Sequence, residues 1–132
     1  MKIKLIFALF FAVNFAFAQK YSIKVTFKNV KKNKGNVKAG LYNEKDVQLS
    51  KMMQIADNQQ VIIIFDNLPA GKYAVKAYQD LNDNKVMDTN FIGIPKEPYG
   101  LSNNIRPKFS KPKIEEMLFE VKGEKSIEIV LN

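Results

Sequence analysis

The chain contains no cysteine and no histidine among its 132 residues. Without cysteine it has no disulfide bond, no thiolate nucleophile and no cysteine-ligated zinc or iron–sulfur centre. Without histidine it lacks the commonest general base, which excludes serine–histidine and cysteine–histidine catalytic machinery as well as histidine-ligated metals. The six glycines are scattered singly, so no glycine-rich phosphate-binding loop is present. Most of the familiar kinds of active site are therefore excluded.

The longest apolar run of the sequence lies at the N-terminus, over residues 5–17, behind two lysines. It ends in Ala16-Phe17-Ala18, the small-x-small pattern of a signal-peptidase site. We expect residues 1–18 to be a cleaved signal peptide and residues 19–132 to form the domain. The run is shorter than the roughly 20 residues of a membrane span, so no span is expected after cleavage, the alternative being a retained anchor. The protein is expected in the periplasm, outside the cell or at its surface.

The expected domain has an ordinary size and a basic charge. Removal of the leader and its two lysines from a chain of net charge +8 leaves about +6. The densest basic cluster, "KNVKKNKGNVK" at 28–38, has no interleaved aromatic residues and matches no nucleic-acid-binding module. We therefore expect no nucleic-acid partner. The cluster is interpreted as a solvated hairpin tip, and the alternative is contact with an anionic surface such as lipid headgroups or a polysaccharide.

Apolar and polar residues alternate with period two over most of the chain, which predicts half-buried β-strands. The predicted strands cover residues 21–28, 36–43, 61–65, 72–79, 116–121 and 126–131, with a seventh within 91–110. The last two are expected to form a hairpin across the turn at 122–125. The fold class is all-β, a single antiparallel β-sandwich of about seven strands, transthyretin-like or immunoglobulin-like.

Two segments are ambiguous. Residues 43–59 read either as a loop or as a short helix. The stretch from Ser110 has the look of a helix start, with Ser110 as the cap and Glu115 and Glu116 in the first turn. A strand from about Glu116 is preferred there, because the residues after it lead directly into the final strand pair.

One stretch, "QDLNDNKVMD", has the oxygen-rich spacing of a calcium-binding loop. The candidate side-chain ligands are Asp80, Asn82, Asn84 and Asp88, with the backbone carbonyl of Val86 between the last two. Carboxylate, amide and carbonyl oxygens are the ligands that hard cations prefer. Lys85 stands where the calcium loop has its glycine, and Phe91 stands where it has its bidentate glutamate. We expect either a weak Ca²⁺ site or a turn whose Asn and Asp side chains bond their own backbone.

A pair of catalytic carboxylates is the remaining kind of active site that this composition allows. Asp66, Asp80, Asp88 and Glu97 are the acidic residues that a folded chain would have to bring together. Solvated carboxylates at strand ends are the ordinary finding, so we expect no enzyme.

The stretch "FDNLPAGKYAVKAYQDLNDNKVMDTNFIGIPKEPYGLSNN", from Phe65 to Asn104, resembles the signature of the domain-of-unknown-function 2141 (DUF2141) family. These are uncharacterised exported bacterial proteins, common in Bacteroidetes. The resemblance covers essentially the whole chain after the leader. It implies a β-sandwich related to transthyretin-like and carboxypeptidase-regulatory-like domains, which often serve as accessory or adhesion modules, and no established activity. The family pattern favours glycine where this chain has Lys85.

The matching "IGIPKEPYGLSNN" segment carries Tyr99, Asn103 and Asn104, which we interpret either as a ligand-facing edge or as part of a rigid loop packed over a sheet end. Three functions follow, in order of preference. The first is a non-enzymatic, exported module with a binding or structural role at the cell envelope, with Ca²⁺ as the only cofactor to test. The second is a carbohydrate- or envelope-binding domain that uses the 91–104 loop, with Tyr99 as a stacking platform. The third is a carboxylate-based hydrolase.

Overall fold

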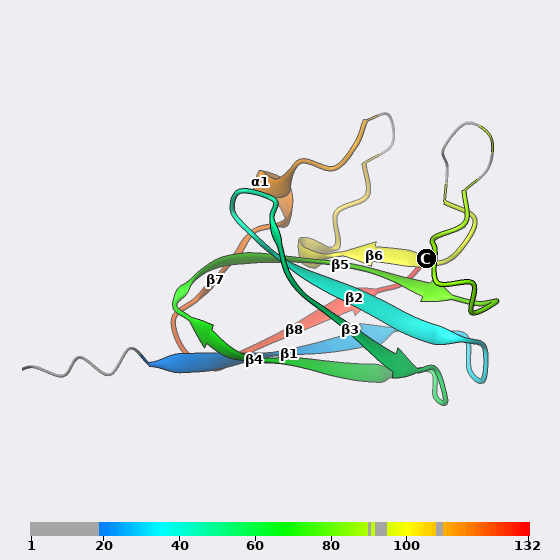
Figure 1. Cartoon of the computed structure of the whole chain (residues 1–132), viewed down its shortest axis with the longest axis horizontal. Helices are drawn as coiled ribbons and strands as arrows, with labels where there is room; N and C mark the ends of the chain where they lie inside the picture. The colour runs from blue at the N-terminus through cyan, green and yellow to red at the C-terminus, as the bar shows by residue number, and fades with distance from the viewer. Residues whose placement is uncertain (1–18, 90, 92–94, 108–109) are drawn as a thin grey trace, which may run out of the picture.

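Two β-sheets pack face to face in the computed structural model, which describes residues 19–89, 91, 95–107 and 110–132 (Figure 1). The elements are β1 (Lys20–Lys28), β2 (Asn36–Asn43), β3 (Gln48–Ile55), β4 (Val61–Pro69), β5 (Gly71–Asp80), β6 (Tyr99–Leu101), the 3-10 helix η1 (Ser102–Asn104), α1 (Ile114–Met117), β7 (Phe119–Val121) and β8 (Lys125–Val130). The three-stranded sheet has the order β4-β1-β8. The five-stranded sheet has the order β3-β2-β5-β6, with β7 beside β6 on the same edge of β5. The predicted all-β sandwich is confirmed.

The core lies between the sheets and is built by the alternation seen in the sequence. Ile23, Val25 and Phe27 of β1 are fully buried and face the inward side chains of β2 and β5. The intervening residues of β1, such as Lys24, are exposed on the outer face of the three-stranded sheet. Alternate burial of this kind is what fixes the strand register, because a slip by one residue would expose the whole apolar set.

The chain crosses between the sheets more often than the sequence suggests. The predicted hairpin of the last two strands is wrong, because β7 pairs with β5 in one sheet while β8 pairs with β1 in the other. The β1–β8 pair is parallel, so the sandwich is not purely antiparallel. Residues 28–38 are likewise not a hairpin tip, since β1 and β2 belong to different sheets. A short connection between two strands can form a hairpin within one sheet or cross to the other sheet. The sequence pattern is the same in both cases, because the flanking strands alternate in the same way.

The two ambiguous segments also have clear structures. Residues 48–55 form β3, an edge strand that pairs with β2 and is exposed along its whole length, so it carries no alternation to reveal it. In the second segment the chain forms one helical turn, α1, and the strand begins at Phe119 rather than at Glu116. The N-cap of α1 is Lys113, which makes no side-chain cap, so the predicted role of Ser110 is wrong.

The outer face of the five-stranded sheet carries a second, small apolar cluster. Ala74, Leu101 and Met117 are buried there, beneath η1 and α1. The described residues of two segments project from this face: residues 81–89, 91 and 95–98, between β5 and β6, and residues 105–107 and 110–113, between η1 and α1 (Figure 1). In the three-stranded sheet, by contrast, β1, β4 and β8 present their outward side chains directly to solvent.

The predicted leader, residues 1–18, lies outside the described residues. Among the residues that are described, no helix is long and apolar enough to cross a membrane.

Candidate functional site

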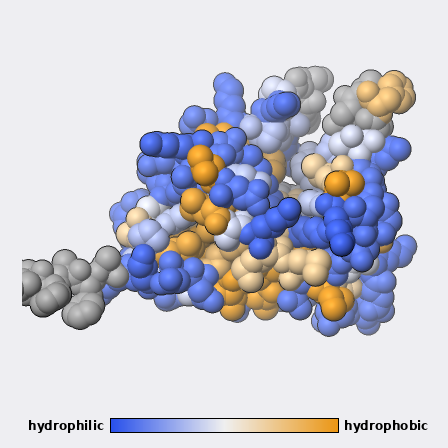
Figure 2. Space-filling view, viewed as in Figure 1, coloured by the Kyte–Doolittle hydropathy of each residue, from blue (hydrophilic) through white to orange (hydrophobic). Residues whose placement is uncertain are grey.

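A groove of about 900 Å³ runs over the outer face of the five-stranded sheet. Its floor is formed by β2, β5 and β6, and its two walls are the projecting segments, represented by Met87 and Pro95 on one side and by Pro107, Lys111 and Pro112 on the other. Figure 2 shows hydrophilic and hydrophobic residues mixed over the side of the molecule in view. A hollow of this size is in the range of binding pockets for small molecules.

Strand register places the floor residues in two rows. One row crosses from Met53 through Lys38 and Tyr78 to Tyr99, and the next crosses from Lys51 through Gly40 and Lys76 to Leu101. The row between them, which includes Ala39 and Ala77, points into the core. Because successive residues of a strand face opposite sides, the tyrosines and lysines of neighbouring strands gather on one face. Among the residues that the structure describes, no aspartate or glutamate lines the groove.

Two of the groove tyrosines are held by cations. The ammonium group of Lys76 lies 4.4 Å from the ring centre of Tyr42 and also pairs with the Asp46 carboxylate at 2.8 Å. The guanidinium group of Arg106 lies 4.5 Å from the ring centre of Tyr99 and donates to the backbone carbonyl of the same residue at 2.8 Å. Each cation fixes the orientation of its ring before a ligand arrives.

Tyr78 lies beside Tyr99 in the floor, directly across the β5–β6 pair. Its side chain is half-buried, and burial raises the pKa of its hydroxyl above the usual value, against an opposing effect of Lys38. The hydroxyl is therefore neutral at physiological pH, and the ring is available as a rigid, mostly apolar platform with a polar tip.

A buried ion pair links the groove floor to the first wall. Asp80, at the end of β5, is fully buried, and its Oδ2 accepts hydrogen bonds from Lys38 Nζ at 2.9 Å and from the backbone N–H of Lys85 at 2.8 Å. Burial by itself would raise the pKa of Asp80, but the hydrogen bonds from Lys38 and from the backbone of Lys85 and Asn84 bring it below its ordinary value. The hydrogen bond to Asp80 raises the pKa of Lys38 against the effect of its burial. Both groups are charged at neutral pH, and they tie the wall to β2 and β5.

Glu97 closes the same wall from its other end. Its carboxylate accepts from the backbone N–H of Leu81 at 2.6 Å and from that of Asp88 at 2.9 Å. Glu97 is 5% exposed, so these are shielded hydrogen bonds to a charged acceptor, which are among the stronger ones in proteins. Its role in holding the loop through two backbone N–H groups was not predicted from the sequence.

Close packing at the base of this wall depends on Gly35, which has a φ of +60°. A Cβ atom at this position would lie 1.7 Å from the backbone oxygen of Asp80. Glycine is required here for two reasons: the positive φ of the backbone, and the close approach of this segment to the backbone of Asp80. The 28–36 connection is held further by the buried side chain of Gln79, which donates to the carbonyls of Lys31 and Lys34, both at 2.7 Å.

The structure brings three of the four predicted calcium ligands into direct contact. Asp88 accepts from the side-chain amides of Asn82 at 2.9 Å and Asn84 at 2.7 Å. The amide oxygen of Asn82 accepts from the backbone N–H of Asn84, and that of Asn84 accepts from Val86 N–H. Asp80 belongs to the same loop but is bonded to Lys38. These are the Asx hydrogen bonds of a turn, and an ion would have to replace them.

The position of Lys85 explains the glycine of the family pattern. Lys85 has a φ of +67°, in the left-handed region that glycine adopts without steric cost. Its backbone N–H is one of the donors to Asp80, so the conformation is needed to fix the loop. In the described part of the chain, no group of three or more acidic, histidine or cysteine residues lies close enough together to hold a metal ion. Calcium binding stays a prediction.

The second wall is anchored by the residues that follow β6. The buried hydroxyl of Ser102 accepts from Val75 N–H and donates to the Met117 carbonyl at 2.6 Å, which joins β5 to α1. The Asn103 amide donates to the carbonyls of Glu116 and Leu118, both at 3.0 Å. The Asn104 side chain bonds the backbone of β8, with its oxygen accepting from Val130 N–H at 2.9 Å.

Of the three residues predicted to face a ligand, only Tyr99 lines the groove. Asn103 and Asn104 both have positive φ and use their amides on the backbone. The sequence interpretation as a rigid loop therefore describes these two asparagines, and a ligand-facing role for Tyr99 stays a prediction.

The candidate catalytic carboxylates do not form one cluster. Asp80, Asp88 and Glu97 lie around the 80–88 loop, but each is engaged in hydrogen bonds that hold that loop. Asp66 lies on β4 in the other sheet, where it accepts from the Ser22 hydroxyl at 2.7 Å.

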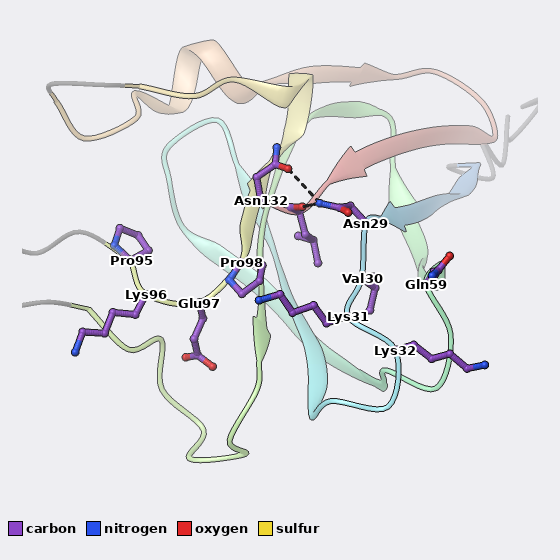
Figure 3. A pocket seen from close by; sticks show the side chains of 11 residues that line it. Asn29, Val30, Lys31, Lys32, Gln59, Pro95, Lys96, Glu97, Pro98 and Asn132 are labelled. Carbon is purple, nitrogen blue, oxygen red and sulfur yellow. Dashed lines mark hydrogen bonds between the residues drawn. The ribbon is translucent and has the colours of Figure 1, made fainter.

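A second hollow, of about 500 Å³, lies beside the C-terminal end of β8, between residues 29–32 and 95–98 (Figure 3). Figure 3 shows Lys32 and Lys96 pointing away from each other at its two sides, so these lysines do not converge on one point. The Asn29 amide crosses one end of the hollow to bond the Leu131 carbonyl at 2.7 Å. This hollow lacks the aromatic floor of the groove.

Comparison with known proteins agrees with the motif found in the sequence. A family model described as "Uncharacterized protein conserved in bacteria (DUF2141)" matches residues 25–129. No curated protein matches the chain. No solved structure matches it. The family match spans both sheets, both walls of the groove and the 80–88 loop, and the chain therefore belongs to the DUF2141 family.

Proposed function

We propose that this protein is an exported, non-enzymatic binding module of the cell envelope, and that its ligand lies in the groove over β2, β5 and β6. The observation that carries the proposal is the groove itself, with a floor of tyrosine and lysine side chains between two anchored walls. The leader-like residues 1–18 support export. This proposal combines the first two functions expected from the sequence, because Tyr99 belongs to the groove.

The rigidity of the groove supports binding without a large ordering cost. One wall is held by Asp80 and Glu97, and the other by Ser102 and Asn103, all through hydrogen bonds to backbone groups. A site whose walls are fixed before binding loses less conformational entropy when the ligand arrives. The floor is part of a sheet whose opposite face is the hydrophobic core, so it is fixed as well.

The chemistry of the lining supports binding rather than catalysis. Among the described lining residues there is no carboxylate, histidine or cysteine, which are the usual general acids, bases and nucleophiles. Two carboxylates contact groove lysines, and each forms an ion pair: Asp80 with Lys38 and Asp46 with Lys76. The hydrolase expected as the third function has no support in this arrangement.

The test is binding of the purified protein to isolated cell envelopes, measured by co-sedimentation. We expect Tyr78→Ala to weaken binding about tenfold, since loss of a stacking ring costs on the order of 1–2 kcal/mol. Tyr78→Phe should retain binding, because the ring is kept. As matched controls, Ile62→Ala and Ile64→Ala remove exposed apolar side chains from the outer face of the other sheet and should leave binding unchanged. Equal binding by Tyr78→Ala and the wild type, with both folded, would refute the groove as the site.

A further inference from the structure

We infer that the ligand of the groove is an acidic polysaccharide, a chain of sugar rings that carries carboxylates at intervals. This inference rests on the proposed function and specifies its ligand. It starts from the charge of the lining, whose described residues include Lys38, Lys51, Lys76 and Lys111 and no acidic residue. A surface with charge of one sign selects a ligand of the opposite sign and excludes others.

Half of this positive charge is already balanced. Lys38 pairs with Asp80 at 2.9 Å, and Lys76 pairs with Asp46 at 2.8 Å. Within the described part of the chain, Lys51 and Lys111 form no ion pair. Both are exposed, and they come from different sides of the groove, Lys51 from β3 and Lys111 from the wall formed by residues 105–113. The groove thus offers a few separated positive charges rather than a dense basic track.

Aromatic rings line the same groove as these charges. Tyr78 and Tyr99 are direct neighbours across the β5–β6 pair, and Tyr42 lies on the next strand, β2. A tyrosine ring presents a flat apolar face with a hydroxyl at its tip, which suits the C–H face and the hydroxyls of a sugar ring. An acidic polysaccharide requires both features: tyrosine rings that contact its sugars, and lysine ammonium groups that pair with its carboxylates.

A single-stranded nucleic acid would also use aromatic rings and positive charge, but it carries one phosphate per nucleotide. Recognition of phosphate favours arginine, whose planar group binds it in a bidentate manner. Arg106 is the only arginine of the chain, and it is engaged with the ring and carbonyl of Tyr99 and with the Asn132 carbonyl. With its arginine engaged in this way, the groove lacks the group that phosphate recognition favours, and its lysines fit carboxylates better than a phosphate backbone.

The test uses two uronate oligomers, hexagalacturonate and hexamannuronate, each compared with its fully methyl-esterified form. The ester keeps the sugar rings and removes the charges. We expect the purified protein to bind at least one acidic oligomer in isothermal titration calorimetry at low salt, and to bind its ester at least tenfold more weakly. The affinity for the acid should fall as salt rises, because exposed charges are screened.

The matched variants change the same number of charges. Lys51→Gln combined with Lys111→Gln should weaken binding of the acidic oligomer about five- to tenfold, since each exposed ion pair contributes up to about 1 kcal/mol. Lys24→Gln combined with Lys122→Gln removes two exposed lysines away from the groove and should change the affinity less than twofold. Equal effects of the two double variants would mean that only the net charge matters, and would overturn the inference.

Other outcomes are equally informative. Equal binding of acid and ester, or no binding of either acidic oligomer, refutes the acidic class. If Tyr78→Ala still abolishes envelope binding in that case, the proposed function stands without this ligand. Tighter binding of a thymidine oligonucleotide than of either uronate would assign the groove to single-stranded nucleic acid, and the inference would be wrong. If envelope binding is unchanged both by Tyr78→Ala and by Lys51→Gln combined with Lys111→Gln, the proposed binding groove and its acidic ligand fail together.

Discussion

The two outer faces of the sandwich have the same alternating strand pattern but very different surroundings. On the three-stranded sheet, outward residues such as Lys28 and Glu128 pair with each other at 3.2 Å in solvent, and Ile62 and Ile64 stand exposed beside them. On the five-stranded sheet, tyrosines and lysines line a groove between two projecting segments. The segments that flank this sheet face are what make a groove of it.

The difference extends to how polar groups are used. The carboxylate of Asp66 on the three-stranded sheet makes one exposed hydrogen bond, to Ser22. The carboxylate of Asp80 on the five-stranded sheet is fully buried, pairs with Lys38 and accepts from two backbone N–H groups. If these buried hydrogen bonds hold the groove wall in place, replacing aspartate with alanine should lower the free energy of unfolding more on the five-stranded sheet than on the three-stranded one.

The largest effect is expected for Asp80→Ala. It leaves Lys38 buried without its partner and removes the acceptor of the Lys85 and Asn84 N–H groups, so it should lower the free energy of unfolding by about 3 kcal/mol. The matched control, Asp66→Ala, should lower it by less than about 1 kcal/mol. Urea unfolding measures both. Similar values for the two variants would show that the two faces are equivalent in this respect.

The stability that the Lys38–Asp80 ion pair contributes to the five-stranded sheet should depend on pH. Asp80 has a lowered pKa in the folded state, so its contribution is present above the ordinary value of 3.8 and is lost as pH falls through the lowered value. Lys38 has a raised pKa, so its contribution is present below 10.5 and is lost as pH rises through the raised value. The stability of the wild type relative to Lys38→Met/Asp80→Leu should be constant between about pH 5 and 9 and fall outside this window. A flat difference from pH 2.5 to 11.5 would contradict the pairing.

A smaller effect of opposite sign is expected at Lys85. Lys85→Gly places the residue best suited to the left-handed backbone at a φ of +67°, and should raise the free energy of unfolding by about 0.5–1 kcal/mol. The control, Lys24→Gly, lies in the extended strand β1 and should lower it by a similar amount. Destabilisation by Lys85→Gly would show that the lysine side chain, rather than the backbone, determines this position.

The smallest effect is expected for calcium. Ten millimolar Ca²⁺ should move the melting temperature by no more than about 1 °C, because the side chains of the 80–88 loop already bond one another and its backbone. A rise of several degrees that a chelator reverses, and that Asp88→Asn removes, would establish the weak ion site that the oxygen spacing also allows.

Much of the sandwich could be predicted because its strands bury every second residue. β1, β2, β4 and β5 each contribute inward apolar residues, and the alternation is visible in the sequence. β3 was missed because it lies at a sheet edge with both faces open, which leaves nothing for the sequence to alternate. The crossing between β7 and β8 was missed because the turn residues do not specify which strand each partner will join.

The groove was harder to predict because its floor residues meet only through strand pairing, and its walls come from two segments that are separate in the sequence. Tyr78 and Tyr99 are adjacent only through the β5–β6 pairing, and Lys38 meets Asp80 only through β2–β5. The signal that could have been used is the outward position of Tyr42, Lys76 and Tyr78 in strands whose other face is apolar. Tyr99 was identified from the family motif, whereas Asn103 and Asn104 were identified there for a ligand role but bond the backbone instead.

The most direct test of the groove is a map of the amide groups affected by the ligand. Soluble fragments released from the envelope would be added to the ¹⁵N-labelled protein, and changes in amide chemical shift would be recorded. We expect the changes to cluster at Gly40, Lys51, Lys76, Tyr78 and Tyr99, and to be absent from Lys24, Ile62 and Glu128. Changes centred on the outer face of the three-stranded sheet would contradict the proposal that the five-stranded sheet carries the binding site.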